Sequence, residues 1–164
     1  MTVLEAIQII DSQVHDKRKG LPEELFQFIS RTTPLVNVDL LIKDGSGNTL
    51  LAWRDDEHSG TGWHVPGGIV RFQETLADRL QKTALREIGT KVDFDRNPIQ
   101  IEELIIPNKD IRGHHISFLY NCRLPVEFIV SNAGKTEKDE GFLKWHKECP
   151  TDLLEIHKMY KKYL

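Results

Sequence analysis

The residue whose position matters most for chemistry is an acid on a helix that follows a glycine pair. An extended run closes in Pro66-Gly67-Gly68, a turn sequence, because glycine permits backbone angles that are closed to other residues. The apolar periodicity that follows predicts a helix from about Glu74 to Ile88, stopped by Gly89. Glu87 falls at the edge of the apolar arc, where a carboxylate is costly unless a metal, a cation or strong donors meet it. Glu87 is therefore either half of a salt bridge or a metal ligand.

The spacing of these residues resembles the Nudix box, whose pattern is G, five residues, E, seven residues and then R-E-apolar-x-E-E-x-G-apolar. The matching positions in this chain are Gly68, Glu74, Ala84, Glu87 and Gly89. The box arginine and two of its acids are replaced by Lys82, Thr83 and Arg86. The chain keeps the frame of the box and one metal-facing acid, which argues against a site that holds several divalent ions.

These departures resemble one branch of the superfamily, the GDP-mannose mannosyl hydrolases, which also lacks most box acids and keeps the last one. Residues 33–39 and 50–54 resemble the first hairpin of that branch, and the likeness is good over about residues 33–92. The resemblance implies that Asp39 lies near the catalytic site and that Arg54 contacts the substrate diphosphate. From the residues alone, the favoured interpretation of Asp39 is an outward-facing strand position, and Arg54 is equally consistent with a surface arginine.

The resemblance also implies a magnesium cofactor, because a nucleoside diphosphate sugar carries two negative charges held close together. Magnesium prefers oxygen ligands, few of them from protein, with phosphate and water completing an octahedron. Glu87 offers a carboxylate, and the turn at Gly67 or Gly68 offers a carbonyl oxygen beside it. Counted back from Trp145, Asp139 falls where the mannosyl hydrolases place a metal-binding amide, so it is the expected third ligand.

The same count puts Glu140 where that branch has a catalytic histidine, so a carboxylate would activate the water in this chain. Glu137 is an alternative base because the loop length differs, and the whole acidic loop is also consistent with a solvated turn. One of His114 and His115 matches a histidine near the active site of the family. We take His115 as the catalytic candidate, against the alternative of a structural or exposed histidine.

Basic side chains are needed at a diphosphate, and the branch carries an arginine directly after the glycine pair. This chain has Ile69 at that position. A guanidinium meets phosphate oxygens with two hydrogen bonds, so arginines elsewhere can compensate. The residues available are Arg54, Arg71 and Arg112, which we assign to substrate binding, together with Lys82 and Lys109. Lys82 is also expected to pair with Glu74 and so to tie the loop to the helix.

Three functions are open. The leading hypothesis is magnesium-dependent hydrolysis of a nucleoside diphosphate sugar, GDP-mannose or GDP-glucose by resemblance, to the nucleoside diphosphate and the free sugar. The second is Nudix cleavage of the diphosphate itself in a nucleotide or nucleotide sugar. The third is a non-catalytic Nudix module that binds a nucleotide sugar. The resemblance also implies a homodimer.

The elements that must position these residues form an α/β arrangement, a Nudix fold with a mixed β-sheet between helices and extra N-terminal helices. Residues 1–164 are expected to form one domain, with a helical extension at 1–31 and the Nudix core at 33–164. The N-terminal helices have no necessary role in the core and could cover the sheet or join a dimer interface. Apart from the central helix, helices are predicted at 3–15, 22–29 and 151–164, and strands at 35–43, 49–54, 91–94, 99–107, 114–124 and 141–146.

The composition of the chain limits the kinds of partner that we expect it to bind. The chain has 164 residues, of which 39% are hydrophobic and 29% charged, as in ordinary soluble globular proteins. Its formal net charge of -3 gives no basic footprint for nucleic acid. No apolar run approaches membrane length, and the N-terminus is amphipathic rather than signal-like. Cys122 and Cys149 form no metal-binding motif. We therefore expect a cytoplasmic protein without nucleic-acid or membrane partners.

Overall fold

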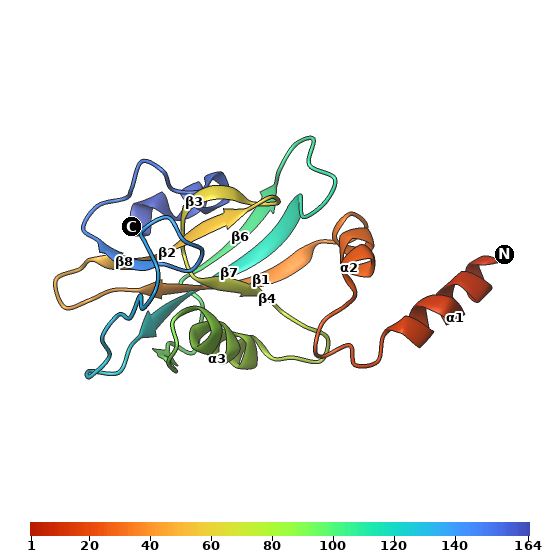
Figure 1. Ribbon diagram of the computed structural model, residues 1–164, viewed down its shortest axis with the longest axis horizontal. Helices are drawn as coiled ribbons and strands as arrows, with labels where there is room; N and C mark the ends of the chain where they lie inside the picture. Colours follow the sequence, from red (N-terminus) through yellow and green to blue (C-terminus); the bar gives the residue numbers. More distant parts are fainter.

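The computed structural model describes residues 1–164 and builds the chain from two β-sheets flanked by helices (Figure 1). In chain order the elements are α1 (Val3–Gln13), α2 (Glu23–Ser30), β1 (Leu35–Ile42), β2 (Thr49–Asp56), β3 (Gly60–His64), β4 (Gly67–Ile69), α3 (Leu76–Glu87), β5 (Asp93–Phe94), β6 (Gln100–Ile105), β7 (His114–Arg123), β8 (Leu143–His146) and the 3-10 helix η1 (Glu155–Tyr163). The predicted strands are all present, with bounds shifted by a few residues.

The first sheet is mixed, as predicted. It has five strands in the order β4-β1-β7-β5, with β6 also paired to β7. Strands β1 and β7 run parallel, whereas β4, β5 and β6 each pair antiparallel with their neighbour. The second sheet is antiparallel and has the order β3-β2-β8. Strands β1 and β2 are joined by the turn at residues 44–48 and belong to different sheets, and they pair only in the isolated bridge between Lys43 and Thr49 at that turn, so the expected hairpin opens into the two sheets.

The side chains of β1 alternate between two hydrophobic clusters, one on each face. Val38 and Leu40 pack with Leu80 of α3 in the larger cluster. Leu41 points the other way and packs in a second cluster with Tyr160 of η1. Because successive side chains of a strand face opposite sides, one apolar strand can serve both clusters. Helices thus cover both faces of the β-structure, which confirms the predicted fold class.

The central helix α3 follows the predicted pattern and begins two residues later than Glu74. Thr75 caps its N-terminus, since its side chain accepts a hydrogen bond from the Asp78 amide and the Asp78 side chain bonds back in a capping box. Leu80 and Ala84 are fully buried on its inner face. Gly89 follows with a φ of 87°, a left-handed conformation in which glycine carries no steric penalty.

The predicted C-terminal helix is different in kind and length. Residues 155–163 form a 3-10 helix, and the segment before it, from Thr151, is a turn. Tyr160 of this helix is fully buried, which anchors the segment on the β-structure. The expectation of an α-helix from Thr151 is wrong. The apolar residues of this segment lie partly in the turn and partly in the 3-10 helix, which is more tightly wound than an α-helix.

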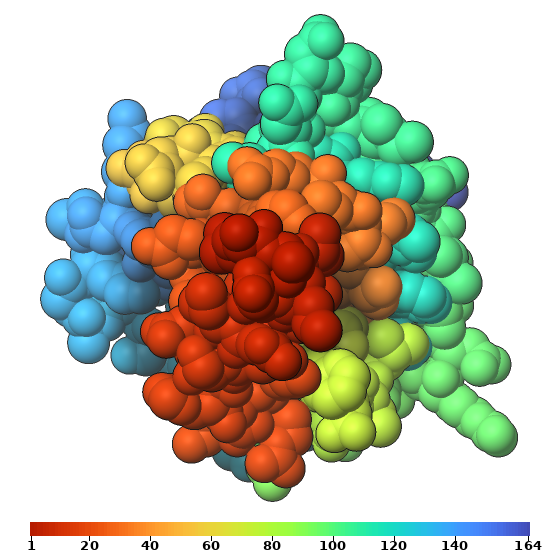
Figure 2. All heavy atoms as spheres, turned by 90° about the vertical axis from the view of Figure 1, so that its right-hand side faces the viewer, coloured from red at the N-terminus to blue at the C-terminus, as the bar shows by residue number.

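The two N-terminal helices are present, and they do not cover the sheet. Helix α2 buries Phe26 and Ser30, whereas α1 has no buried residue. Figure 1 shows α1 projecting away from the sheets, and Figure 2 looks at it from that end, with α1 in red before α2 in orange. None of the helices is both long enough and apolar enough to cross a bilayer.

Candidate functional site

The glycine pair lets strand β4 lie against both β1 and α3 at close range. A Cβ atom at Gly67 would stand 2.1 Å from Oδ1 of Asp39, and one at Gly68 would stand 2.5 Å from Oγ1 of Thr83. Both distances are far below a normal contact, so only glycine fits at these two positions. The pair thereby brings the backbone of Gly67 beside the buried carboxylate of β1, with its carbonyl oxygen 3.2 Å from Nη2 of Arg86 on α3.

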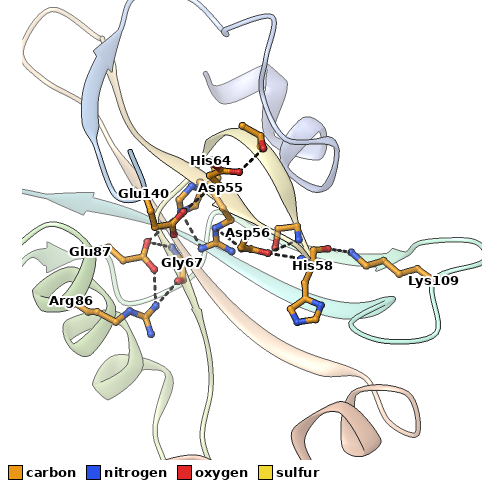
Figure 3. Close-up of polar contacts among 12 residues, drawn as sticks. Asp55, Asp56, His58, His64, Gly67, Arg86, Glu87, Lys109 and Glu140 are labelled. Carbon is orange, nitrogen blue, oxygen red and sulfur yellow. Dashed lines mark hydrogen bonds and ion pairs between the residues drawn. The ribbon is translucent and has the colours of Figure 1, made fainter. Parts of the chain in front are cut away.

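Glu87 lies at this junction and is fully engaged with protein groups (Figure 3). Its Oε1 accepts a hydrogen bond of 2.7 Å from Nη2 of Arg86, and its Oε2 accepts one of 3.1 Å from the amide of Gly67. Nε2 of His64 lies 3.5 Å from the same Oε2. Burial on its own would raise the pKa of Glu87, yet His64 and Arg86 together hold that pKa below its ordinary value. Glu87 is an ion-paired carboxylate in this structure.

A pocket of about 260 Å³ opens in front of this junction and is rich in basic groups. Its lining comes from strands β1 to β4, the C-terminal end of α3, the residues before β7 and its start, the start of α2, and η1. The Lys and Arg residues of the lining are Arg54, Arg71, Arg86, Lys109 and Arg112, and the carboxylates are Glu23 and Asp39. The surplus of cations, in a recess that partly excludes water, suits a ligand with several negative charges.

The three arginines predicted to bind substrate all line this pocket. Arg54 sits at the end of β2, with Nη2 3.3 Å from Nε2 of His64, and its Nε has no hydrogen-bond partner. Nearby positive charges join burial in lowering the pKa of Arg71. Arg112 stacks on Phe26 of α2 at 4.9 Å, and its Nε also lacks a hydrogen-bond partner. The three arginines thus lie at one pocket, and their contact with a substrate stays a prediction.

Asp39 also lines the pocket, and its side chain is almost wholly buried. Its Oδ2 accepts a hydrogen bond of 2.7 Å from the hydroxyl of Tyr160. Burial raises the pKa of the Asp39 carboxyl to about 7, while the hydrogen bond from Tyr160 opposes that rise. The hypothesis of a simple outward-facing strand position is wrong, because Asp39 points into the molecule beside the glycine pair.

His115 reaches the pocket, with both of its ring nitrogens in use. Nε2 lies 2.8 Å from the carbonyl oxygen of Arg112, and Nδ1 lies 3.3 Å from Nδ2 of Asn37. An N–H on Nε2 and a lone pair on Nδ1 satisfy both contacts, which describes a neutral ring. Burial accordingly lowers the pKa of His115. In this geometry His115 holds the loop before β7 in place, and its catalytic role stays a prediction.

The acidic residues of the loop before β8 do not reach the pocket. Oδ2 of Asp139 accepts two hydrogen bonds from Thr136, one of 2.6 Å from its amide and one of 3.0 Å from its hydroxyl. Glu140 accepts a hydrogen bond of 2.6 Å from the amide of Asp55, and Glu137 pairs with Lys144. All three acids are exposed, and none of them lines the pocket. The structure therefore does not place Asp139 beside Glu87 or Glu140 beside Asp39.

The residues present do not fit the magnesium ion that the resemblance implies. Of the three expected donors, the Gly67 carbonyl and Glu87 both already bond to the Arg86 guanidinium, and Asp139 lies elsewhere. Nowhere in the chain are three or more His, Cys, Asp or Glu side chains grouped so that they could hold a metal ion. This corrects the expected ligand set, because a positively charged side chain already contacts two of its members.

The Glu74 contacts confirm the expected pair with Lys82 and add a stronger one. Lys82 approaches to 2.9 Å, but Arg79, which is buried, donates to Glu74 from Nε at 2.7 Å and from Nη2 at 2.6 Å. Burial would raise the pKa of Glu74, and these partners lower it. Sequence reasoning missed Arg79 because a buried arginine cannot be told from an exposed one without its partner.

Three further residues of the site were not identified from the sequence. The helical pattern assigned Arg86 to the solvent side, and His64 and Tyr160 gave no local signal. The replacement of a metal-facing acid at position 86 by a base was the one available clue, because it puts a cation where the box has a carboxylate.

Comparison with solved structures identifies the architecture. A MutT Nudix hydrolase from Burkholderia pseudomallei aligns with a TM-score of 0.63 at 19% identity, over 80% of this chain and 98% of that one. A Nudix hydrolase from Nitrosomonas europaea gives 0.55 at 14% identity, over 70% and 72% of the two chains. The chain has the Nudix fold. A MutT protein from Methanosarcina mazei also shares it, with a TM-score of 0.53 at 19% identity, over 70% of this chain and 78% of that chain.

Sequence similarity covers less of the chain. The low-salt glycan biosynthesis protein Agl8 of Haloferax volcanii is 39% identical over 75 residues, which are 46% of this chain and 47% of that protein. The match thus spans about half the length of this curated relative. No protein-family model matches the sequence. The comparisons therefore establish the fold of the chain.

Proposed function

We propose that this protein binds a nucleoside diphosphate sugar in the arginine-lined pocket and hydrolyses it to the nucleoside diphosphate and the free sugar. The observation that carries the proposal is the meeting of five basic side chains, from separate parts of the chain, around one recess. Charged donors of this kind bind phosphate oxygens with strong, short hydrogen bonds. A diphosphate is the small-molecule group that best matches so many cations in so small a volume.

Unpartnered polar atoms at the pocket support the proposal. Buried nitrogen and oxygen atoms normally have hydrogen-bond partners, and each exception needs an explanation. Four of the residues that carry such an exception line this pocket, namely Asn37, Arg54, His64 and Arg112. These four atoms are shielded from solvent in this conformation, so a polar ligand satisfies them only when the side chains turn toward the pocket, and we propose that they do so on binding.

Asp39 is the carboxylate best placed for the chemistry. It lies in the pocket beside the arginines, whereas Glu87 is paired and Glu140 faces another strand. In the proposed reaction a water oxygen bonds to the sugar carbon, and the bond from that carbon to the diphosphate oxygen breaks. The electron pair of the broken bond leaves with the diphosphate, whose charge the arginines stabilise, and the water proton passes to Asp39.

The similarity to Agl8 supports the sugar part of the proposal. The name of that relative assigns it to glycan biosynthesis, a process that uses activated sugars. The base and the sugar of the substrate are left open, and GDP-mannose and GDP-glucose remain the first compounds to test. Cleavage of the diphosphate itself is disfavoured, because the depleted box supplies only one acid and that acid is ion-paired.

A second candidate function is binding without turnover. The specific observation in its favour is that Glu87 and His115 have their polar atoms occupied by protein groups. A module with this arrangement would hold a nucleotide sugar through its arginines and release it unchanged. Both candidates share the same pocket and differ only in whether a water is activated.

One experiment separates these functions. A panel of nucleoside diphosphate sugars is incubated with the protein, once with a chelator and once with magnesium, and the products are separated by ion-exchange chromatography. Nucleoside diphosphate plus free sugar is the expected result, and nucleoside monophosphate plus sugar phosphate would indicate diphosphate cleavage. Affinity by calorimetry without any product would establish the binding module. Absence of both affinity and turnover across the panel would reject the proposal.

A further inference from the structure

The position of Arg86 carries an inference about how the pocket obtains its positive charge. Nη2 of Arg86 donates to Oε1 of Glu87 at 2.7 Å and to the carbonyl oxygen of Gly67 at 3.2 Å (Figure 3). One nitrogen therefore joins the helix end to the glycine turn. These two oxygens are the ones that the box offers to a divalent cation.

The Arg86 guanidinium occupies the space between the Glu87 carboxylate and the Gly67 carbonyl, where the box would hold a metal ion. Its second oxygen, Oε2, accepts from the Gly67 amide at 3.1 Å and faces His64 at 3.5 Å. A magnesium ion needs oxygen atoms at about 2.0–2.1 Å in an octahedron. Placing one between Glu87 and Gly67 would require the guanidinium to leave, and it would expose the ion to the positive charge of Arg86. The carboxylate can satisfy one of these two cations at a time.

Arg86 keeps most of its hydrogen-bonding capacity for a ligand. A guanidinium has five N–H groups, and only Nη2 has partners within the protein. The side chain is 55% exposed and belongs to the lining of the pocket. Its neighbours in that lining include Arg71, whose pKa is lowered by burial and then by the charges of Arg79 and Arg86. The guanidinium is thus anchored at one edge and open at the other.

We propose that Arg86 replaces the divalent cation of the Nudix box, so that this pocket binds a diphosphate without metal. The inference rests on the proposed function in its choice of ligand, and on the Arg86 contacts for the replacement itself. Glu87 and the Gly67 carbonyl then both serve to orient the guanidinium through Nη2. A cation that belongs to the chain is present in every molecule, whatever the concentration of free metal.

The test uses two independent readouts on the full chain. The first is binding of Mn²⁺, followed by electron paramagnetic resonance as the loss of the free-ion signal. We expect no binding by the wild type and none by Arg86→Ala at sub-millimolar Mn²⁺. Arg86→Glu restores the box acid beside Glu87 and is expected to bind Mn²⁺, and the double variant with Glu87→Gln is expected to lose that binding. Mn²⁺ binding by the wild type that disappears in Glu87→Gln would overturn the replacement.

The second readout is the affinity for pyrophosphate in a chelator, measured by calorimetry. The wild type is expected to bind, and Arg86→Ala is expected to bind at least tenfold more weakly. Arg123→Ala is a matched control, because Arg123 lies at the opposite end of β7 and pairs with Asp95. Thermal unfolding of each variant establishes that it is folded. Affinity that is unchanged in Arg86→Ala would overturn the role of Arg86 in binding.

The two readouts separate the failure of this inference from the failure of the proposed function. If the wild type binds pyrophosphate only when magnesium is added, the pocket is a diphosphate site and the replacement is wrong. If the wild type binds neither pyrophosphate nor any nucleotide sugar under either condition, the proposed function fails. The Mn²⁺ measurement then still decides whether Glu87 holds a metal ion in the wild type.

Discussion

At the scale of single residues, the pocket depends on guanidinium groups held where a diphosphate would lie. Arg54 is the clearest case, because its side chain is 23% exposed, lines the pocket and leaves Nε without a hydrogen-bond partner. Nε itself lies 3.7 Å from Oδ2 of Asp56, an ion pair too long for a hydrogen bond, and Nη2 lies 3.3 Å from Nε2 of His64. The Arg54 guanidinium is therefore held at the pocket and has hydrogen-bonding capacity that no protein group uses.

Replacing Arg54 is therefore expected to weaken diphosphate binding. We predict that Arg54→Ala lowers the affinity for a nucleoside diphosphate about tenfold or more, which corresponds to ~1.4 kcal/mol or more. Calorimetric titration with GDP and UDP measures the effect, with Arg123→Ala as the control for loss of a positive charge. Equal affinities in the two variants would contradict a role for Arg54 at the phosphates.

The raised pKa of Asp39 predicts a stability that depends on pH. With a folded pKa of about 7 and an ordinary value of 3.8, the folded state retains a proton that the unfolded state has lost between these two pH values. The stability of the wild type should therefore fall as the pH rises from about 4 to about 7. Asp39→Asn has no such proton to lose, so its free energy of unfolding should depend less on pH in this range.

Urea unfolding at pH 5 and pH 8 tests this. At roughly 1.36 kcal/mol per pH unit, the wild type should lose about 2–3 kcal/mol relative to Asp39→Asn between the two conditions. Asparagine can still accept the hydrogen bond from Tyr160, which makes it a conservative replacement. Parallel pH dependences in the two proteins would show that Asp39 is ionised at both pH values.

At the scale of elements, the site exists because β4 can approach β1 and α3 without side chains of its own. Gly67→Ala would put a methyl group 2.1 Å from Oδ1 of Asp39 and 3.1 Å from the carbonyl oxygen of Val38. We predict a loss of about 1–3 kcal/mol in the free energy of unfolding, because these neighbours belong to a buried strand. Gly45→Ala is the matched control, since no heavy atom lies within 4 Å of its added Cβ.

Chemical denaturation of both variants measures the difference. The control is expected to stay within about 0.5 kcal/mol of the wild type, as surface substitutions usually do. If Gly67→Ala is as stable as Gly45→Ala, then β4 has freedom to move away from Asp39 and the close approach is not required.

The elements were more predictable from the sequence than the site was. The β-rich, mostly apolar composition of β1 and the apolar arc of α3 are local signals, and both segments form the elements that they indicate. The contact between Tyr160 and Asp39 joins residues that are 121 positions apart, and no local pattern specifies it. A helical wheel places the Cβ of Arg86 toward solvent, but the long side chain carries its charge back to the glycine turn. The predicted position of Asp139 beside Glu87 was wrong because it was obtained by counting back from Trp145 through a loop of variable length.

At the scale of the whole molecule, the N-terminal helix is the part that the core does not explain. Helix α1 buries none of its residues, and it exposes the apolar side chains Val3, Leu4, Ile7, Ile9 and Ile10. Contiguous exposed apolar surface commonly marks an interaction site. The homodimer that the resemblance implies is our proposal for what covers this helix.

Deletion of residues 1–14 tests the proposal. The full chain is expected to have the mass of a dimer in light scattering, and the truncated chain the mass of a monomer. Pyrophosphate binding should persist in the truncated chain, because the pocket takes its N-terminal lining from residues 21–26 and not from α1. A full chain that is monomeric at all concentrations would reject the dimer.

The fixed charges of the pocket have a consequence for its behaviour in different solutions. Attraction between an anion and arginines that are only partly covered is weakened by dissolved ions, and the range of such attraction shrinks from about 10 Å at 0.1 M ionic strength to about 3 Å at 1 M. Affinity for a phosphorylated ligand should thus decline steadily as potassium chloride is added. Sulfate should compete more strongly than chloride at equal ionic strength, since Arg54 and Arg112 can meet its oxygens directly.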